Sequence, residues 1–343
     1  MVKKNREVWR KMGLFRPDSD PANQLQHIAY NMPRRQTTRH ILMVRPANFG
    51  FNEETAVNNA FQRRDGELSP DAVRKQARKE FDRFVEALRE AGVQVIVAQD
   101  SARPFKPDAV FPNNWVSFHQ EGLIITYPMF APLRRKERRR SVIEAVLDAG
   151  FSANKRVNLA FNEKINRYLE GTGSVIFDHV HRLAYACLSP RTDAQLLQEL
   201  CQLLDYKPVV FHAADGQGQD IYHTNVMMAL GEDFVVVCLE SVQDATERQK
   251  LKALFEKTGK EIVEISLEQM NSFAGNMLQV RNDREETILV MSEQAYRALK
   301  PVQIATLERH TRLLHCPIDV IERYGGGSAR CMMAEVFLPE VDR

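Results

Sequence analysis

Residues 182–215, RLAYACLSPRTDAQLLQELCQLLDYKPVVFHAAD, carry the pattern that decides the fold. The stretch begins with RLAYACLS, an apolar run typical of a buried strand. It continues with the helical pattern DAQLLQELCQLL and ends in the β-rich run KPVVFHAAD. We therefore expect a strand, a helix and a second strand in this order.

The same order recurs along the chain, and internal repeats define an architecture. The first strands of the repeats are HILMVRPA, GLIITYPM, RLAYACLS, DFVVVCLES and TILVMSEQA. A helical pattern follows each of them, and the next β-rich runs are VQVIVAQD, RVNLAFN, KPVVFHAAD, EIVEISL and PIDVIERYG. Each unit then closes with a loop and a third strand, which we call a mouth segment. The mouth segments are FPNNWVSFH (111–119), GTGSVIFD (171–178), YHTNVMMAL (222–230), FAGNMLQV (273–280) and GGGSARCMMAEVF (325–337).

Five strand–helix–strand–strand units predict an α/β propeller, a closed ring with pseudo-fivefold symmetry. The loops of all five units would then converge on one central site. The alternative is a doubly wound α/β sheet, in which alternating strands and helices carry no fivefold meaning. The first unit contains an insertion after its first strand, and we expect residues 49–62 to form a lid over the site rather than an ordinary surface excursion.

The composition narrows the class of protein. The chain has 343 residues, 44% of them apolar and 27% charged, and its net charge of +2 is too small to indicate a nucleic-acid surface. No apolar stretch approaches the roughly 20 residues of a membrane-spanning helix. We expect a polar N-terminal extension over residues 1–39 and one catalytic domain over residues 40–343. We expect a small-molecule substrate and no nucleic-acid or membrane partner, while a homodimer stays open.

The five cysteines are an odd number without paired spacing. Their pattern matches neither a disulfide framework nor a zinc cluster, so we expect no metal, no cofactor and a cytoplasmic location.

The mouth segments place a thiol, an imidazole and a carboxylate at equivalent points of the repeat. These groups are Cys331, His223 and Glu170. The set suits covalent catalysis, with a cysteine nucleophile, a histidine acid/base and a glutamate that orients and charges the site. Taken singly, the cysteine could be a buried filler, the histidine a structural one and the glutamate a helix end. Their joint placement favours the catalytic interpretation.

Four motifs, in order, resemble a known superfamily. They are DAVFPNNW, EGTGSVIFD with the later SPRT, YHTN, and GGGSARCMM. Over about residues 40–343 the chain resembles the pentein-fold guanidino-group-modifying superfamily of arginine deiminases, dimethylarginine hydrolases and amidinotransferases. With MVRPANFGFNEETAVNNAFQ included, it is most similar to the bacterial citrulline-utilisation hydrolases, or citrulline ureidases.

This resemblance implies a role for each matching residue. Cys331 would be the nucleophile, His223 the general acid/base and Glu170 the partner of the reacting group's nitrogens. A protonated His223 would favour the thiolate. The implied substrate-binding residues are Asp108 for the ammonium group, Phe111 and Asn114 in the same motif, Asn225, Arg191 for the α-carboxylate, and Arg134 or Arg135 as a second candidate for that carboxylate.

Two departures from the superfamily pattern bear on the substrate. Asn114 and Asn225 stand where arginine-processing relatives have aspartates. A guanidinium is cationic and normally meets carboxylates, whereas an amide can both donate to and accept from a neutral ureido group. We therefore expect hydrolysis of citrulline to ornithine, CO2 and ammonia through a covalent cysteine intermediate. The alternatives are an arginine or methylarginine deiminase or amidinotransferase, and a non-catalytic pentein binding factor.

Overall fold

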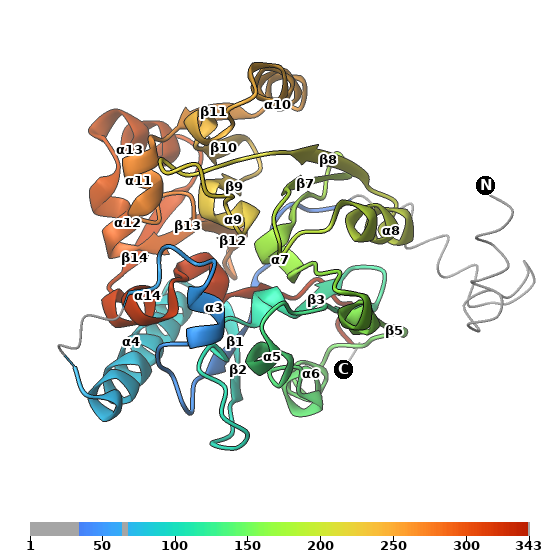
Figure 1. The fold of residues 1–343 in the computed structure, drawn as a ribbon, viewed down its shortest axis with the longest axis vertical. Helices are drawn as coiled ribbons and strands as arrows, with labels where there is room; N and C mark the ends of the chain where they lie inside the picture. The colour runs from blue at the N-terminus through green and yellow to red at the C-terminus, as the bar shows by residue number, and fades with distance from the viewer. Residues whose placement is uncertain (1–33, 64–67, 342–343) are drawn as a thin grey trace, which may run out of the picture. The chain divides into compact units, whose positions relative to one another are not determined.

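The computed structural model describes residues 34–63 and 68–341, and these residues contain five three-stranded sheets built to one plan (Figure 1). In each sheet a middle strand pairs antiparallel with an inner strand and parallel with an outer strand. The middle strands are β1 (His40–Arg45), β4 (Leu123–Thr126), β7 (Leu183–Cys187), β10 (Phe234–Val237) and β13 (Thr287–Ser292). The outer strands are β2 (Gln94–Gln99), β5 (Lys155–Asn158), β8 (Lys207–Phe211), β11 (Glu261–Glu264) and β14 (Arg312–Cys316).

The inner strands are β3 (Val116–His119), β6 (Ile176–Asp178), β9 (Met228–Leu230), β12 (Leu278–Arg281) and β15 (Ala334–Glu335). Neighbouring inner strands lie against one another, as β3 does against β15 and β9 against both β6 and β12. The last inner strand, β15, pairs with the first middle strand, β1, so that Ile41 lies opposite Glu335. The ring is therefore closed by strands from opposite ends of the domain, and the predicted pseudo-fivefold α/β propeller is confirmed.

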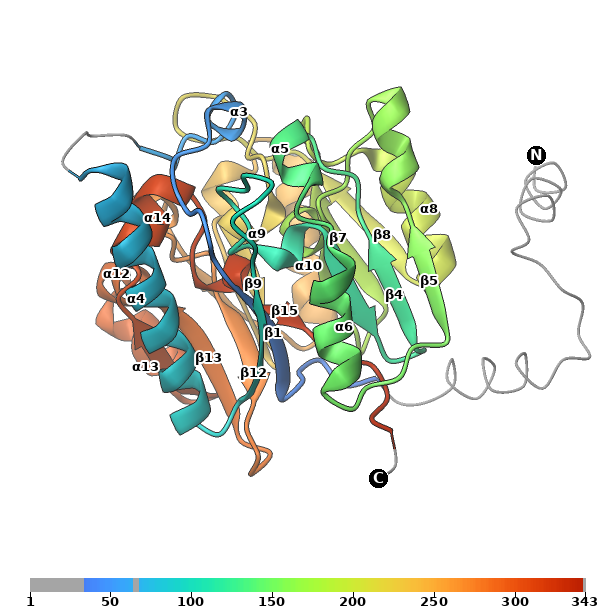
Figure 2. The same ribbon diagram turned by 90° about the horizontal axis from the view of Figure 1, so that it is seen from below.

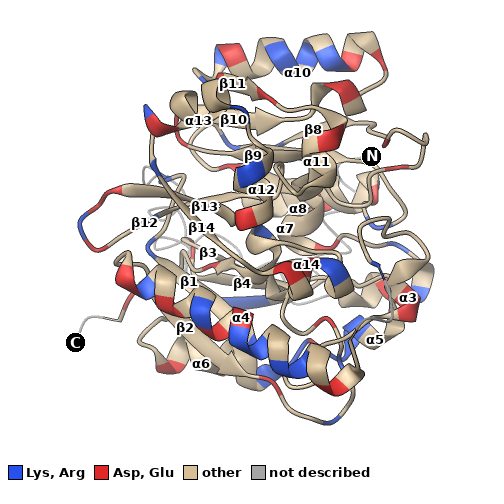
Figure 3. Ribbon diagram, turned by 90° about the vertical axis from the view of Figure 1, so that its left-hand side faces the viewer, with Lys and Arg blue, Asp and Glu red and all other residues tan. Residues whose placement is uncertain are grey.

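Helices join the middle and outer strands because a parallel pair needs a crossover connection. These helices are α4 (Pro70–Glu90), α6 (Arg140–Asp148), α8 (Ala194–Leu204), α10 (Ala245–Lys257), and α12 (Glu293–Ala298) with α13 (Pro301–Glu308). They surround the sheets in Figure 1, and their solvent sides carry many of the charged residues, as α4 and α10 show in Figure 3.

Helix α4 illustrates why these segments are helical. Its N-cap Ser69 accepts a hydrogen bond from the backbone N–H of Ala72, and a proline follows at the first helical position. Phe81, Phe84 and Leu88 recur at helical spacing and are buried against the sheets. The apolar face stabilises the helix through packing, while its charged face meets the solvent.

Short helical turns lie between the outer strand of one unit and the inner strand that follows. They are η1 (Pro112–Asn114), α7 (Gly171–Ser174), α9 (Thr224–Met227), α11 (Leu267–Asn271) and η4 (Ala329–Met332). All but α11 lie within the mouth segments. The remaining short helices are α3 (Glu53–Ala56), α5 (Pro132–Arg135), η2 (Ala160–Ile165) and η3 (Leu239–Ser241).

One expectation is wrong. PIDVIERYG, taken as the β-rich run of the fifth unit, instead forms helix α14 (Asp319–Gly325), while the preceding RLLHC forms strand β14. Just before β1, the Gln36 side chain donates to the Phe177 carbonyl at 2.8 Å. Residues 1–33 of the predicted extension lie outside the described residues. In residues 34–63 and 68–341, no helix has the length and apolar character required to cross a bilayer.

Candidate active site

A small pocket lies where the mouth segments converge. Its lining comes from three mouth segments, from the insertion after β1, and from three charged residues: Asp108, which precedes the first mouth segment, and Arg134 and Arg191, which follow the middle strands β4 and β7. The lining residues are Thr55, Asn59, Asp108, Phe111, Asn114, Arg134, Arg191, Tyr222, His223, Gly325, Gly326, Gly327 and Cys331. Seven of the nine predicted site residues are among them. The other two, Glu170 and Asn225, contact His223 and Cys331, respectively.

The glycine turn before Cys331 is needed for close packing. Gly326 has φ = +63°, a conformation that non-glycine residues rarely adopt. A Cβ atom on Gly325 would lie 2.8 Å from the Phe111 ring. The turn therefore brings its backbone against this ring and leads into η4, where Cys331 is buried at the pocket.

His223 and Glu170 form a buried pair. His223 Nε2 lies 2.8 Å from Glu170 Oε2, and the other carboxylate oxygen accepts the backbone N–H of Phe130 at 2.9 Å. Burial opposes ionisation of Glu170, but Arg191 and the hydrogen bond from His223 outweigh it and lower the pKa of Glu170 to about 2. The carboxylate is therefore ionised, and it fixes the imidazole with its proton on Nε2.

The imidazole itself is neutral at pH 7. Burial lowers the pKa of His223 to about 4, against the opposing effect of Glu170. With Nε2 protonated toward Glu170, Nδ1 carries a free lone pair and can act as a base. This differs from the expectation of a protonated His223 beside the sulfur, because the apolar and cationic surroundings disfavour a second positive charge.

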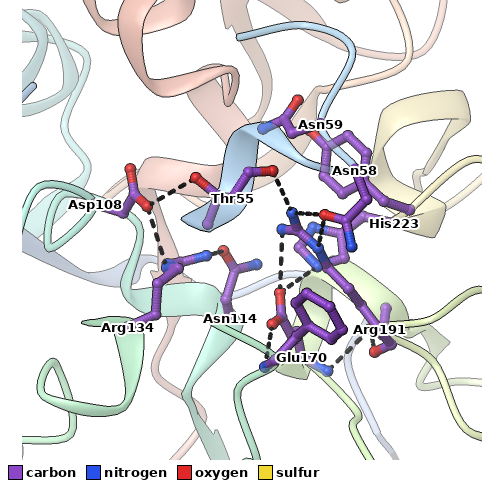
Figure 4. Close-up of polar contacts among 12 residues, drawn as sticks. Thr55, Asn58, Asn59, Asp108, Asn114, Arg134, Glu170, Arg191 and His223 are labelled. Carbon is purple, nitrogen blue, oxygen red and sulfur yellow. Dashed lines mark hydrogen bonds and ion pairs between the residues drawn. The ribbon is translucent and has the colours of Figure 1, made fainter. Parts of the chain in front are cut away.

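Arg191 lies under the insertion after β1 (Figure 4). Its Nε donates to Asn58 Oδ1 at 3.0 Å and its Nη2 to the Thr55 carbonyl at 3.0 Å. Its Nη1 lies 3.6 Å from Glu170 Oε2, and the guanidinium stacks over the Tyr222 ring at 4.8 Å from the centroid. Asn58 and Thr55 were not predicted from the sequence, because nothing in the insertion marks them as partners of an arginine.

Arg134 is held by its own surroundings. Its Nε and Nη2 each lie 3.0 Å from a carboxylate oxygen of Glu137, and Nη2 also donates to the Phe111 carbonyl. Nη1 donates to Asn114 Oδ1 at 2.8 Å. All three guanidinium nitrogens are thus engaged within the protein, and two of them are paired with the Glu137 carboxylate. Arg191 Nε and Nη2 instead donate to neutral oxygens of Asn58 and Thr55, which makes Arg191 the better candidate for a substrate carboxylate. Arg135 instead donates to the Met129 carbonyl and does not line the pocket.

The Arg134 contact orients Asn114. A guanidinium only donates, so Asn114 must turn its oxygen toward Arg134 and its NH2 group away. That NH2 group is buried and has no hydrogen-bond partner. It lies close to His223, since a Cβ on Gly173 would be 2.4 Å from Asn114 Nδ2 and 2.8 Å from His223 Nδ1. An unused donor therefore lies beside the His223 imidazole.

Asp108 offers the complementary group at another side of the pocket. Its Oδ2 accepts from Asn52 Nδ2 at 2.6 Å and lies 3.8 Å from Arg134 Nε. Its Oδ1 is buried without a partner. Burial raises the pKa of Asp108 although Arg134 opposes the shift, so a cationic substrate group would satisfy an otherwise costly site.

The insertion closes the pocket from above (Figure 4). Asn59 Nδ2 donates to the Gly326 carbonyl and Gln62 Nε2 to the Tyr324 carbonyl. Helices α3 and α5 lie at the same end of the ring (Figure 2), where the Leu133 N–H donates to Glu54 Oε2 at 2.6 Å. In this structure residues 52–62 thus cover the site, as expected of a lid.

Comparisons with known proteins agree with this geometry. The family model described as "N,N dimethylarginine dimethylhydrolase, eukaryotic" matches residues 45–338. The chain therefore belongs to this family, and with it to the pentein guanidino-group-modifying superfamily. No curated protein sequence matches the chain.

Several solved structures share the fold. Apo ArgZ, an arginine dihydrolase from the ornithine–ammonia cycle in cyanobacteria, has a TM-score of 0.68 at 18% identity, over 88% of this chain and 41% of its own. The N-terminal domain of ArgZ with a covalent reaction intermediate has a TM-score of 0.67 at 19% identity, over 88% of this chain and 99% of its own. A dimethylarginine dimethylaminohydrolase variant in an adduct with S-methyl-L-thiocitrulline has a TM-score of 0.59 at 18% identity, over 87% of this chain and 99% of its own. The chain thus spans about 41% of the length of full ArgZ.

Proposed function

We propose that this protein is a cysteine-dependent hydrolase that converts citrulline to ornithine, CO2 and ammonia. The observation that carries the proposal is the orientation of Asn114, whose buried NH2 group faces away from Arg134 without a partner. A buried donor of this kind calls for an acceptor on the substrate.

The two candidate head groups differ at this point. The ureido group of citrulline presents a carbonyl oxygen, which accepts a hydrogen bond from Asn114. The guanidinium of arginine presents only N–H groups and a positive charge, which would meet an N–H donor. Glu170, the carboxylate beside His223, is already engaged by His223, Arg191 and the Phe130 backbone. A neutral head group therefore fits the contacts better than a cation.

The remaining groups suit the amino-acid end of the substrate. Asp108 has a buried carboxylate oxygen without a partner, and an α-ammonium group would satisfy it. Arg191 lines the same pocket and suits the α-carboxylate. The substrate carboxylate would take over contacts that Asn58 and the Thr55 carbonyl now make with Arg191.

Cys331 and His223 line the same pocket, and the proposed chemistry uses the two side chains together. His223 Nδ1 accepts the thiol proton, and the thiolate attacks the ureido carbon while Asn114 donates to the developing oxyanion. The imidazolium then gives its proton to the leaving nitrogen, which releases ornithine and leaves a carbamoyl thioester on the sulfur. His223 next takes a proton from water, which attacks the thioester. The products are carbamate, which decomposes to CO2 and ammonia, and the regenerated thiol.

A direct test is incubation of the purified protein with L-citrulline or L-arginine, followed by measurement of ornithine, citrulline and ammonia. We expect ornithine from citrulline with one ammonia per turnover, and no ornithine from Cys331→Ala. Citrulline accumulating from arginine, with no ornithine from citrulline, would show that the substrate assignment is wrong. Activity retained in Cys331→Ala would exclude covalent catalysis at this residue.

A second candidate is hydrolysis of arginine or a methylated arginine. It is favoured by the dimethylarginine hydrolase family match and by the similarity to ArgZ, described as an arginine dihydrolase. The same thiolate would attack the guanidinium carbon and release ammonia or a methylamine, which leaves citrulline after hydrolysis. The same assay, with a methylated arginine as a third substrate, separates the candidates, because this route produces citrulline and forms no ornithine from citrulline.

A further inference from the structure

The sulfur of Cys331 is held by two side-chain amides. Asn225 Nδ2 lies 3.4 Å from Sγ and Asn276 Nδ2 lies 3.3 Å from it. Asn225 belongs to the third mouth segment and Asn276 to the fourth. The fourth segment contributes no residue to the pocket lining, but Asn276 brings it into contact with the nucleophile.

Asn276 can present only its NH2 group to the sulfur. Its Oδ1 accepts the backbone N–H of Arg330 at 3.1 Å, and its Nδ2 also donates to the backbone carbonyl of Asn225 at 2.8 Å. If the amide were flipped, its NH2 group would face the Arg330 N–H and its oxygen would face the Asn225 carbonyl, and both hydrogen bonds would be lost. The orientation is therefore fixed by partners that cannot change roles.

The backbone at Gly275, next to Asn276, packs closely against the third mouth segment. A Cβ on Gly275 would lie 2.3 Å from the Val226 carbonyl oxygen. Only a glycine thus allows the fourth mouth segment to approach helix α9, which carries Asn225. The amide is held between the third and fifth mouth segments and reaches the sulfur from a rigid support.

The nearby histidine and arginines, which could otherwise balance the negative charge of a thiolate, already have partners. His223 is neutral and bonded to Glu170. The guanidinium of Arg134 is paired with Glu137, and that of Arg191 lies against Glu170 and the lid. Hydrogen bonds to an ionised group are roughly twice as strong as those between neutral groups. A pair of amide donors at the sulfur therefore favours the thiolate over the thiol.

We propose that Asn276 is a catalytic residue whose amide, together with that of Asn225, stabilises the thiolate of Cys331. The inference rests on the nucleophilic role of Cys331 in the proposed function, but not on the identity of the substrate. Once sulfur has transferred its charge to the substrate, these bonds weaken, and they strengthen again when the thiolate departs from the thioester.

The test is the pH dependence of Cys331 alkylation by iodoacetamide, followed by mass spectrometry of the peptide that carries it. Asn276→Ala removes one donor, and we expect the midpoint of the alkylation curve to move upward by about one pH unit. Asn276→Asp retains an acceptor for the Arg330 N–H but places an anion beside the sulfur, so its midpoint should move further upward. The aspartate keeps the contact with the Arg330 N–H but loses the bond to the Asn225 carbonyl. A purely structural role therefore predicts a loss of stability in both variants without an ordered rise of the alkylation midpoint.

Asn162→Ala is the matched control, since this buried amide donates to the Leu159 carbonyl and lies outside the pocket. Its alkylation midpoint should equal that of the native protein. Asn225→Ala serves as the second donor variant if the Asn276 variants do not fold, and it should also move the midpoint upward. A midpoint that stays within about 0.2 units of the native value in the folded donor variants overturns the proposal.

The readout needs no substrate and is thus separate from the substrate question. Loss of citrulline hydrolysis with a normal midpoint would count against Asn276 but not against the proposed function. A shifted midpoint in a protein that does not hydrolyse citrulline would support Asn276 and reject the substrate.

Discussion

Replacement of Asn114 by aspartate tests the discrimination between a ureido and a guanidinium group most directly. The substitution conserves shape, so the oxygen that accepts from Arg134 Nη1 at 2.8 Å keeps its partner. The other side-chain atom, now a buried NH2 group without a partner, becomes a carboxylate oxygen. The variant therefore exchanges a donor for a charged acceptor at one point beside His223.

The expected magnitude follows from the single contact. Citrulline loses one hydrogen bond and its carbonyl meets a carboxylate, which together cost about 2–3 kcal/mol, or roughly 30- to 150-fold in kcat/KM. Arginine gains a charge-assisted contact of about 1.5–3 kcal/mol in place of an opposed N–H. The two effects together amount to about 3.5–6 kcal/mol, so the ratio of kcat/KM for citrulline to that for arginine should fall by roughly 400- to 25,000-fold.

Steady-state rates on both substrates, measured with one preparation of each protein, give this ratio. Asn271→Asp, an exposed change outside the pocket, is the control and should leave the ratio unchanged. A ratio for Asn114→Asp within about threefold of the native value would falsify the argument, because the amide would then not distinguish the head groups.

Three further predictions follow from particular contacts. Gly173→Ala would place a Cβ 2.4 Å from Asn114 Nδ2, so we expect kcat/KM to fall at least about 100-fold. Gly216→Ala is the control and should keep full activity, because its Cβ would meet nothing closer than 3.9 Å. Burial raises the pKa of Glu322 to about 8 from an ordinary 4.5, so the folded protein holds a proton that the unfolded chain has lost. The free energy of unfolding should then decrease as the pH rises from about 4.5 to 8, by at most on the order of 4 kcal/mol, and thermal melts of Glu322→Gln should lack this decrease; parallel curves for the two proteins would contradict the assignment. Asp108→Asn should raise KM for citrulline about tenfold and leave KM for a citrulline analogue without the α-amino group unchanged, and an equal effect on both compounds would rule out the ammonium contact.

The sequence was sufficient to predict the ring because each of its five units is locally encoded. Strand, helix and strand follow one another within one repeat, and the periodicity of apolar residues changes at each boundary. The error at PIDVIERYG has a local cause as well. Its apolar residues are compatible with either a strand or a helix. The segment forms a helix in which Ile321 and Tyr324 are buried against neighbouring units, and such long-range contacts are not visible in a sequence pattern.

The site was only partly accessible from the sequence. Cys331 and His223 lie in mouth segments and Glu170 directly precedes one, so the repeat itself brought them to one end of the ring. The partners of Arg191 lie in the insertion, which has no counterpart in the other repeats. Their contacts depend on how a loop folds over the pocket rather than on any local pattern.

Arg134 shows a different limit. The sequence suggested a second partner for the substrate carboxylate, whereas the structure pairs Arg134 with Glu137 and uses it to orient Asn114. The spacing Arg-x-x-Glu in RRKE is a signal of this pair, since residues three apart in a helical turn face each other. The sequence signal for Asn276 is weaker, because it consists only of an asparagine after a glycine in the fourth mouth segment. The structure shows that this amide lies 3.3 Å from Cys331 Sγ.

The pairing of β15 with β1 has a consequence for how the protein folds. Four sheets consist of strands that lie near one another in the sequence, whereas the first needs Leu42 to find Ala334. Contacts of such long sequence separation form slowly. We therefore expect a transient species in which four sheets have formed while the segment with Cys331 and β15 is not yet packed against β1. During refolding, enzymatic activity should then appear later than most of the secondary structure.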